Sequence, residues 1–143
     1  KRDRFREVFA GFNPAAVARY GETEVELLMG DAGIIRHRGK IESAINNATL
    51  CLELVEQFGS LTGWLWSWEP DQSVREIDGS IPASTPASAA LSHDLKTRGW
   101  SFVGPTTIYA LMQAVGMVND HLPDCWAHPA VEAERAALLR PVR

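Results

Sequence analysis

The sequence predicts one all-α domain over residues 1–143, and three observations support that prediction. Apolar residues recur at helical spacing along most of the chain, glycine or proline stands where helices should end or begin, and no stretch alternates apolar and polar residues as a strand does. The chain has 143 residues, of which 45% are hydrophobic and 22% charged, a balance typical of an ordinary globular protein with a core.

In the first half of the chain we expect two short helices and then a long one. Asn13 is the expected cap of the first, with Pro14 at its first position, and Thr23 is the expected start of the second. The long helix lies within residues 33–59, where Gly59 provides the stop. Its apolar positions at helical spacing are Ile34, Ile41, Ile45, Leu52 and Val55.

A short aromatic segment and then a loop follow the long helix. Three tryptophans alternate in "LTGWLWSWEP", and we interpret them as a core anchor rather than a base-stacking platform: Trp64, Trp66 and Trp68. Residues 71–88 are rich in small polar residues and proline, which predicts a loop over the surface.

The second half of the chain predicts two helices around a tight turn and one more helix after them. Ser88 is expected to cap the first of these helices, and Gly99 ends it. The turn at 103–105 leads into the second, and a charged amphipathic pattern predicts a last helix within 128–143. The second helix should bury one stripe of side chains, formed by Ile108, Leu111, Met112 and Val115.

Composition and charge exclude several classes of protein. No run approaches the roughly 18 uncharged apolar residues of a membrane helix, and the charged start "KRDRFREVF" is not a signal peptide. Two cysteines, Cys51 and Cys125, are too few for a disulfide scaffold and favour the reducing cytoplasm. The formal net charge of −4 argues weakly against non-specific nucleic-acid binding, but local backbone amides can bind phosphate whatever the total charge.

The turn at 103–105 has the features of an anion site. A helix begins with N–H groups that have no partner inside the helix, and its dipole favours negative charge there. Pro105 suits the first helical position, and Gly104 permits a tight turn and the close approach of another backbone. On these residues alone an ordinary helix start is the commoner explanation. The candidate phosphate-binding residues are Val103, Gly104, Thr106 and Thr107.

The wider context favours the phosphate interpretation. The chain contains a helix-hairpin-helix, formed by "LSHDLKTRGW", a short turn and "GPTTIYALMQAVG". In this motif the hairpin amides hold a DNA phosphate independently of base sequence. The segments "DAGIIRHRGKIESAINNA", "LWSW" and the long block over 81–121 resemble 3-methyladenine DNA glycosylase I, a branch of the helix-hairpin-helix DNA glycosylase superfamily. The resemblance runs from about Phe5 to Cys125.

This resemblance implies both a fold and an enzymatic activity. The fold would be a helical helix-hairpin-helix glycosylase domain. The activity would be base-excision repair, in which the enzyme flips 3-methyladenine out of alkylated double-stranded DNA and hydrolyses its glycosidic bond. The resemblance also implies a monomer, with no membrane partner.

The resemblance further implies a structural zinc ion, with His121 and Cys125 as two of its four ligands. In the family, a segment preceding the position of Lys1 carries the other two ligands and the glutamate and aromatics that hold the base. We therefore expect this chain to be a fragment of a longer one. The spacing of His121 and Cys125 alone is weaker evidence for a zinc site. Two ligands four residues apart could share a helical face, but a surface histidine beside a half-buried cysteine would have the same spacing.

The sequence does not identify the catalytic residues. Asp120 lies roughly where many helix-hairpin-helix glycosylases keep a catalytic aspartate, but the branch that the chain resembles is understood to work without it. It could equally lie in a turn that orients His121. Basic residues near the hairpin and in "RHRGK" either flank a phosphate track or form an ordinary charged surface: Arg36, Arg38, Lys40, Lys96 and Arg98.

Two functions other than a glycosylase remain open from the sequence. One is a noncatalytic helix-hairpin-helix DNA-binding module. The other is a helical protein-interaction domain, which would have no affinity for duplex DNA.

Overall fold

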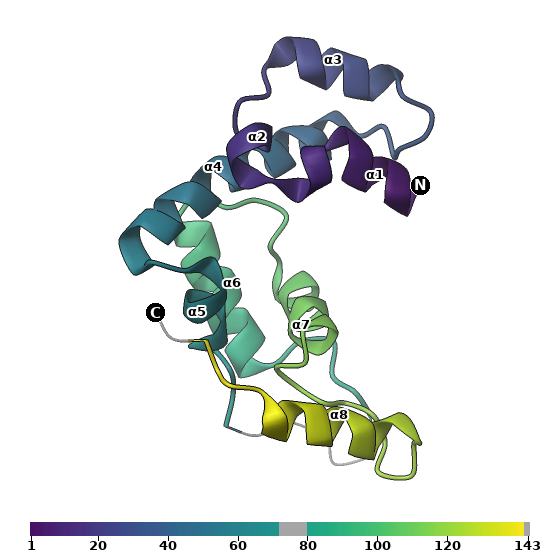
Figure 1. Cartoon of the computed structure of the whole chain (residues 1–143), viewed down its shortest axis with the longest axis vertical. Coiled ribbons are helices and arrows are strands. Elements are labelled where there is room, and N and C mark those ends of the chain that lie inside the picture. The colour runs from purple at the N-terminus through teal and green to yellow at the C-terminus, as the bar shows by residue number, and fades with distance from the viewer. Residues whose placement is uncertain (72–79, 142–143) are drawn as a thin grey trace.

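The computed structural model describes residues 1–71 and 80–141, and within these ranges all regular structure is helical, which confirms the predicted class (Figure 1). Of the expected loop over 71–88, residues 72–79 lie outside the described part of the chain. The helices, in chain order, are α1 (Arg2–Val8), η1 (Ala10–Phe12), α2 (Pro14–Val17), α3 (Glu22–Gly30), α4 (Arg38–Phe58), α5 (Leu61–Trp66), α6 (Pro86–Thr97), α7 (Pro105–Ala114) and α8 (Ala127–Ala137).

Two clusters of buried side chains form the core, and α4 contributes to both. The N-terminal core joins α1, α2 and α3 to the first half of α4, through Phe9, Val17, Val25, Leu28, Ile34 and Ile41. The C-terminal core joins the end of α4 to α5, α6 and α7, through Leu54, Trp64, Leu91, Leu95, Val103, Ile108, Tyr109, Met112, Met117 and Val118. Because one helix of 21 residues runs through both, it fixes the position of each against the other.

The ends of α4 follow from its sequence. The Nδ1 atom of His37 accepts a hydrogen bond from the amide of Lys40 at 3.2 Å and so caps the first turn. At the other end Gly59 has φ 78°, a conformation that glycine adopts without steric cost, and the predicted stop is confirmed. Asn13 likewise caps α2 as predicted, with Pro14 at its first position.

Two predicted helix starts are wrong, because each helix begins before the residue that was expected to start it. Helix α3 begins after Gly21, not at Thr23, and the Glu24 carboxylate accepts the Gly21 amide at 2.7 Å. Helix α6 is capped by Thr85, not by Ser88. Ser88 stands three residues inside, where its hydroxyl accepts from the Thr85 amide at 2.9 Å while Thr85 Oγ1 accepts from the Ser88 amide at 3.2 Å.

The buried face of α7 differs by one position from the predicted stripe. Ile108 and Met112 are buried as expected, but Val115 is 43% exposed and Tyr109 is buried in the C-terminal core. The tryptophan prediction is confirmed, since Trp64 is fully buried and the other two pack against the same core.

Ion pairs fasten the end of the described chain to the C-terminal core. The carboxylate of Glu69 accepts two hydrogen bonds from the Arg140 guanidinium, both at 2.8 Å, and lies 3.4 Å from Arg135 of α8. Asn119 donates to Glu132 at 2.7 Å and so fixes α8 to the segment that follows α7. No helix in the described ranges is long and apolar enough to cross a membrane.

Candidate nucleic-acid interface

The hairpin that the sequence predicts lies between α6 and α7, which pack against each other. Val103 is buried, whereas Thr106 and Thr107 are exposed in the first turn of α7. Gly104 is the N-cap, and no side chain caps this helix end. The first amide to bond within α7 is that of Ile108, which donates to the Gly104 carbonyl at 2.9 Å. The amides of the two threonines therefore lie at an exposed helix N-terminus, where the dipole favours an anion.

Gly104 is not required by the fold. Its φ of −63° and ψ of 158° are open to any residue, and a Cβ atom built there would meet nothing within 4 Å. Gly104 permits the turn as expected, but the turn does not need the conformational freedom of glycine there. Two loop residues before Gly104 have positive φ, Gly99 at 90° and Phe102 at 58°. Gly104 does leave open space beside the helix N-terminus, and another backbone needs that space to come close.

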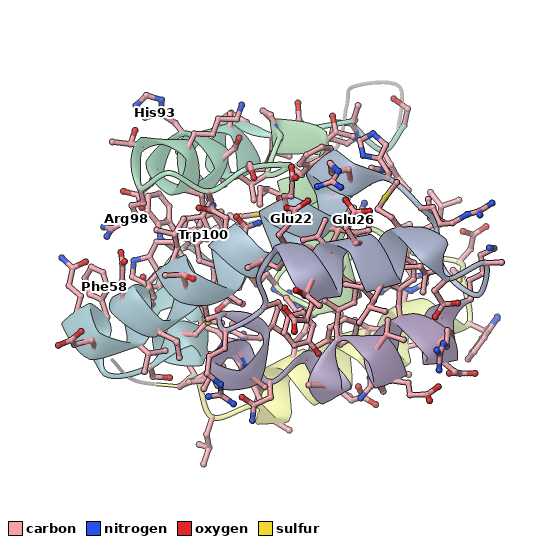
Figure 2. The ribbon with its side chains drawn as sticks, turned by 90° about the horizontal axis from the view of Figure 1, so that it is seen from above. Glu22, Glu26, Phe58, His93, Arg98 and Trp100 are labelled. Carbon is pink, nitrogen blue, oxygen red and sulfur yellow. The ribbon has the colours of Figure 1, made fainter. Side chains whose placement is uncertain are left out.

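Arg38 and Arg98 are engaged by other groups of the protein. Arg38 on α4 pairs with three carboxylates, those of Glu22, Glu26 and Glu42, and this contact holds the pKa of Glu22 below its usual value. Figure 2 shows Glu22 and Glu26 side by side on α3. These contacts favour the charged-surface alternative for Arg38.

Arg98 at the end of α6 also has a structural role. It donates to Asp94 at 2.6 Å and to Gln57 at 2.8 Å, and its guanidinium lies over the rings of Phe58 and Trp64, at 5.1 and 5.6 Å. Figure 2 shows Arg98 close to Phe58 on this side of the molecule, with His93 pointing outward from α6. Arg98 thus ties α6 to α4 and α5.

His121 and Cys125 come together in a turn, not on the face of a helix as their spacing had suggested. The Cys125 amide donates to the Leu122 carbonyl at 2.9 Å, and the Sγ atom of Cys125 lies 3.6 Å from Nδ1 of His121. A nitrogen and a sulfur ligand of tetrahedral zinc stand about 3.6 Å apart, given bond lengths of roughly 2.0–2.1 and 2.3 Å. The pair therefore fits two corners of a zinc site. No group of three or more His, Cys, Asp or Glu residues within 1–71 and 80–141 could hold a metal.

Asp120 binds to α7 rather than to the histidine beside it. It is 8% exposed, and its Oδ2 atom accepts hydrogen bonds from Tyr109 Oη and Gln113 Nε2, both at 2.7 Å. The His121 amide is held by Asn119 Oδ1 instead, at 3.3 Å. Asp120 thus fastens the segment after the hairpin to its second helix.

Sequence reasoning missed a set of polar contacts between α4 and the hairpin loop. Asn47 bonds both backbone groups of Ser101, and Ser92 of α6 donates to the Val103 carbonyl at 2.6 Å. Asn47 and Ser101 are 54 residues apart, so no local pattern connects them.

Similarity to known proteins identifies the family. A family model described as methyladenine glycosylase matches residues 1–128. DNA-3-methyladenine glycosylase 1 of Escherichia coli (strain K12) is 44% identical over 132 residues, which are 90% of this chain and 71% of that protein. DNA-3-methyladenine glycosylase of Haemophilus influenzae is 38% identical over 128 residues, or 87% of this chain and 69% of the relative.

Solved structures agree with this match. One of them is a structure of 3-methyladenine DNA glycosylase I from Staphylococcus aureus, solved to explain 3-methyladenine recognition. It superposes with a TM-score of 0.82 at 30% identity, and the match covers 90% of this chain and 70% of that one. A crystal structure of 3-methyladenine DNA glycosylase I at 45% identity gives a TM-score of 0.80, over 90% and 72% of the two chains. The fold is that of the helical DNA glycosylases. Within that class, the chain belongs to the methyladenine glycosylase family.

Proposed function

We propose that the protein carries out the reaction of its family, the hydrolysis of the N-glycosyl bond between 3-methyladenine and deoxyribose in alkylated DNA. The observation that carries the proposal is the family match over residues 1–128, a range that includes the hairpin and both of its helices. The relatives are named for this activity, and one structural neighbour is a variant in complex with 3-methyladenine.

The chemistry of the substrate explains which tasks remain for the protein. Adenine methylated at N3 carries a positive charge, so its glycosidic bond is already weakened and water can displace the base from the sugar carbon. The damaged nucleotide must first leave the base stack, at a cost of a few kcal/mol. A protein that holds the neighbouring backbone in a fixed position can support that rotation, because phosphate contacts set orientation without reading sequence.

In this proposal the hairpin supplies the backbone contact. The amides of Thr106 and Thr107 and the open space at Gly104 receive one phosphate of the duplex, with Val103 holding the turn in the C-terminal core. Binding through amides needs little net positive charge, which suits a chain with a formal net charge of −4. Weak non-specific binding also suits an enzyme that must keep scanning DNA.

The zinc ion implied by the resemblance is part of the proposal. His121 and Cys125 would hold it with two further ligands, and it would supply folding energy rather than catalysis. We further propose double-stranded DNA as the partner, a monomer as the active form and the cytoplasm as the location.

The experiment compares the protein, expressed from its complete reading frame, with a Gly104→Val variant. Because the site has ordinary backbone angles and open space, the free energy of unfolding should change by less than about 0.5 kcal/mol. Base release per enzyme at low substrate concentration should fall about tenfold or more, because the added methyl groups keep the phosphate from the amides.

Either of two results would count against the proposal. If the valine variant releases base at the wild-type rate, the hairpin does not hold the phosphate. If the wild type binds duplex DNA and the valine variant does not, yet neither releases base, the chain is the noncatalytic DNA-binding module.

A further inference from the structure

The side-chain amide of Asn47, on α4, pairs with the backbone of Ser101 in the hairpin loop. Its Oδ1 atom accepts the Ser101 N–H at 3.1 Å, and its Nδ2 atom donates to the Ser101 carbonyl at 3.0 Å. One side chain thus satisfies both backbone groups of one residue, as a neighbouring strand would. In Figure 1 this loop leaves α6 beside α4 and then runs to α7.

Ser43, one turn earlier on α4, strengthens the same contact. Its hydroxyl donates to the Ser101 carbonyl at 3.2 Å and accepts from the Ser101 hydroxyl at 2.7 Å. We call Ser43, Asn47 and their bonds to Ser101 the α4 clamp. Ser43 is buried and Asn47 half-buried, so these bonds are shielded from competing water.

The loop is also fixed on its other side, and the residue between the two anchors is strained. Ser92 of α6 holds the Val103 carbonyl at 2.6 Å, while the α4 clamp holds Ser101. Between them Phe102 has φ 58°, a left-handed conformation that is strained for a residue other than glycine. Such strain persists only where the surrounding contacts over-determine the backbone, and here they do.

We propose that Asn47, supported by Ser43, is a positioning residue that sets the backbone of 101–104 so that the first amides of α7 face the DNA phosphate. The proposal rests on the proposed function, and it names the residues that orient the hairpin within it. Gly104 lies three residues beyond the clamped Ser101, so a shift of the loop moves the phosphate site directly. Interactions of this kind lose their effect when groups move by about 1 Å.

The clamp also explains why the position of the hairpin is tied to α4. Since α4 contributes to both cores, a loop bonded to it is placed relative to the N-terminal core as well as to its own helices. A hairpin held by α6 and α7 alone would not be positioned relative to the N-terminal core.

The test is an Asn47→Asp variant with Asn46→Asp as the matched control. At 47 the carboxylate still accepts the Ser101 amide but repels the Ser101 carbonyl. At 46 the same charge is added on the same helix. The bonds lost there are those to the Gly99 carbonyl at 3.1 Å and to Asn47 Oδ1 at 3.3 Å, and both groups of Asn47 that bond Ser101 are kept. We expect the Kd for methylated duplex DNA, measured on folded protein well below its Tm, to rise about tenfold for N47D and less than threefold for N46D.

A Ser43→Ala variant tests the clamp without adding charge and serves if N47D does not fold. We expect it to raise the Kd about threefold. Two results would overturn the proposal. In the first, N47D and S43A lose thermal stability but keep the wild-type Kd. In the second, N47D and N46D have equal Kd values.

Failure of the clamp differs from failure of the proposed function. If the wild type binds duplex DNA, Gly104→Val weakens that binding and N47D does not, only the clamp is wrong. If the wild type does not bind duplex DNA, both are wrong.

Discussion

At the scale of single residues, the strained backbone of the hairpin loop lies at Phe102 and not at Gly104. Phe102 is 54% exposed as a residue, and its ring meets His37 edge-on at 6.1 Å between ring centres. A large exposed aromatic in left-handed conformation gains little from burial, so the contacts of Ser101 and Val103 must hold it there.

This strain predicts opposite tolerance for two substitutions at position 102. Asparagine adopts left-handed φ readily, whereas a β-branched valine does not. Since both lose the ring, we expect Phe102→Val to be less stable than Phe102→Asn by at least about 1 kcal/mol. Urea unfolding of the two variants gives this difference, and equal midpoints and slopes would show that the left-handed backbone is not maintained in solution.

The two cysteines should differ in reactivity. Burial raises the pKa of the Cys51 thiol and keeps reagents away from it, whereas Cys125 is partly exposed beside His121. We expect a thiol reagent at about pH 8 to modify Cys125 at least tenfold faster, as measured by intact mass and peptide mapping.

The proposal that His121 and Cys125 bind zinc adds a second expectation to that experiment. Saturating Zn²⁺ should slow the modification of Cys125 and leave the slow rate at Cys51 unchanged. Equal rates at Cys125 with zinc and with a chelator, in protein from the complete reading frame, would rule out Cys125 as a ligand.

At the scale of elements, Asp31 fastens the end of α3 to α1. Its Oδ1 atom accepts the Gly33 amide at 2.7 Å, and its Oδ2 atom accepts from Arg4 Nε at 2.7 Å. The Gly33 amide first, and then Arg4, hold the pKa of Asp31 below its ordinary value near 3.8. Gly33 itself has no room for a side chain, since a Cβ atom would lie 2.8 Å from both Arg4 Cγ and Asp31 Oδ1.

The lowered pKa of Asp31 sets the direction of a pH effect. Because the folded pKa lies below the unfolded one, the contribution to stability is present above about pH 4 and is lost as pH falls through the folded value. Asp31→Asn should therefore lower Tm at neutral pH and flatten the fall of Tm in acid. Melting curves from about pH 2 to pH 7 test this, and curves that stay parallel down to the lowest pH would contradict it.

The elements also show where sequence reasoning succeeds and where it stops. The caps Asn13 and Gly59 are local signals, and those predictions are confirmed. Helical periodicity predicted the helices but not every buried position, since Ile34 precedes α4 and both Leu52 and Val55 are exposed. The starts at Thr23 and Ser88 were misplaced because in each case the pattern marked a residue inside the helix, while the true cap lies upstream.

At the scale of the whole molecule, contacts between distant segments could not be predicted from the sequence. The bonds of Asn47 to Ser101 and of Arg98 to Gln57 join residues 54 and 41 positions apart. A polar residue on a helix gives no sign of whether solvent or a distant backbone will be its partner. The candidate hairpin was found because its residues are adjacent in sequence, and the α4 clamp was not because its residues are far apart.

The proposed function lets a chain with net negative charge bind DNA through backbone amides. Two cores joined by α4 hold the hairpin, and the hairpin presents amides rather than a basic surface. The chain spans about seven-tenths of the length of its relatives, with 71% and 69% of the two curated proteins matched.

The measurement that tests the central claim most directly is the release of free base from methylated duplex DNA by protein expressed from its complete reading frame. The account predicts that 3-methyladenine appears in the soluble fraction, and that an unmethylated duplex of the same sequence releases none. Folded, zinc-supplied protein that releases no 3-methyladenine would contradict the assignment of this activity to the protein.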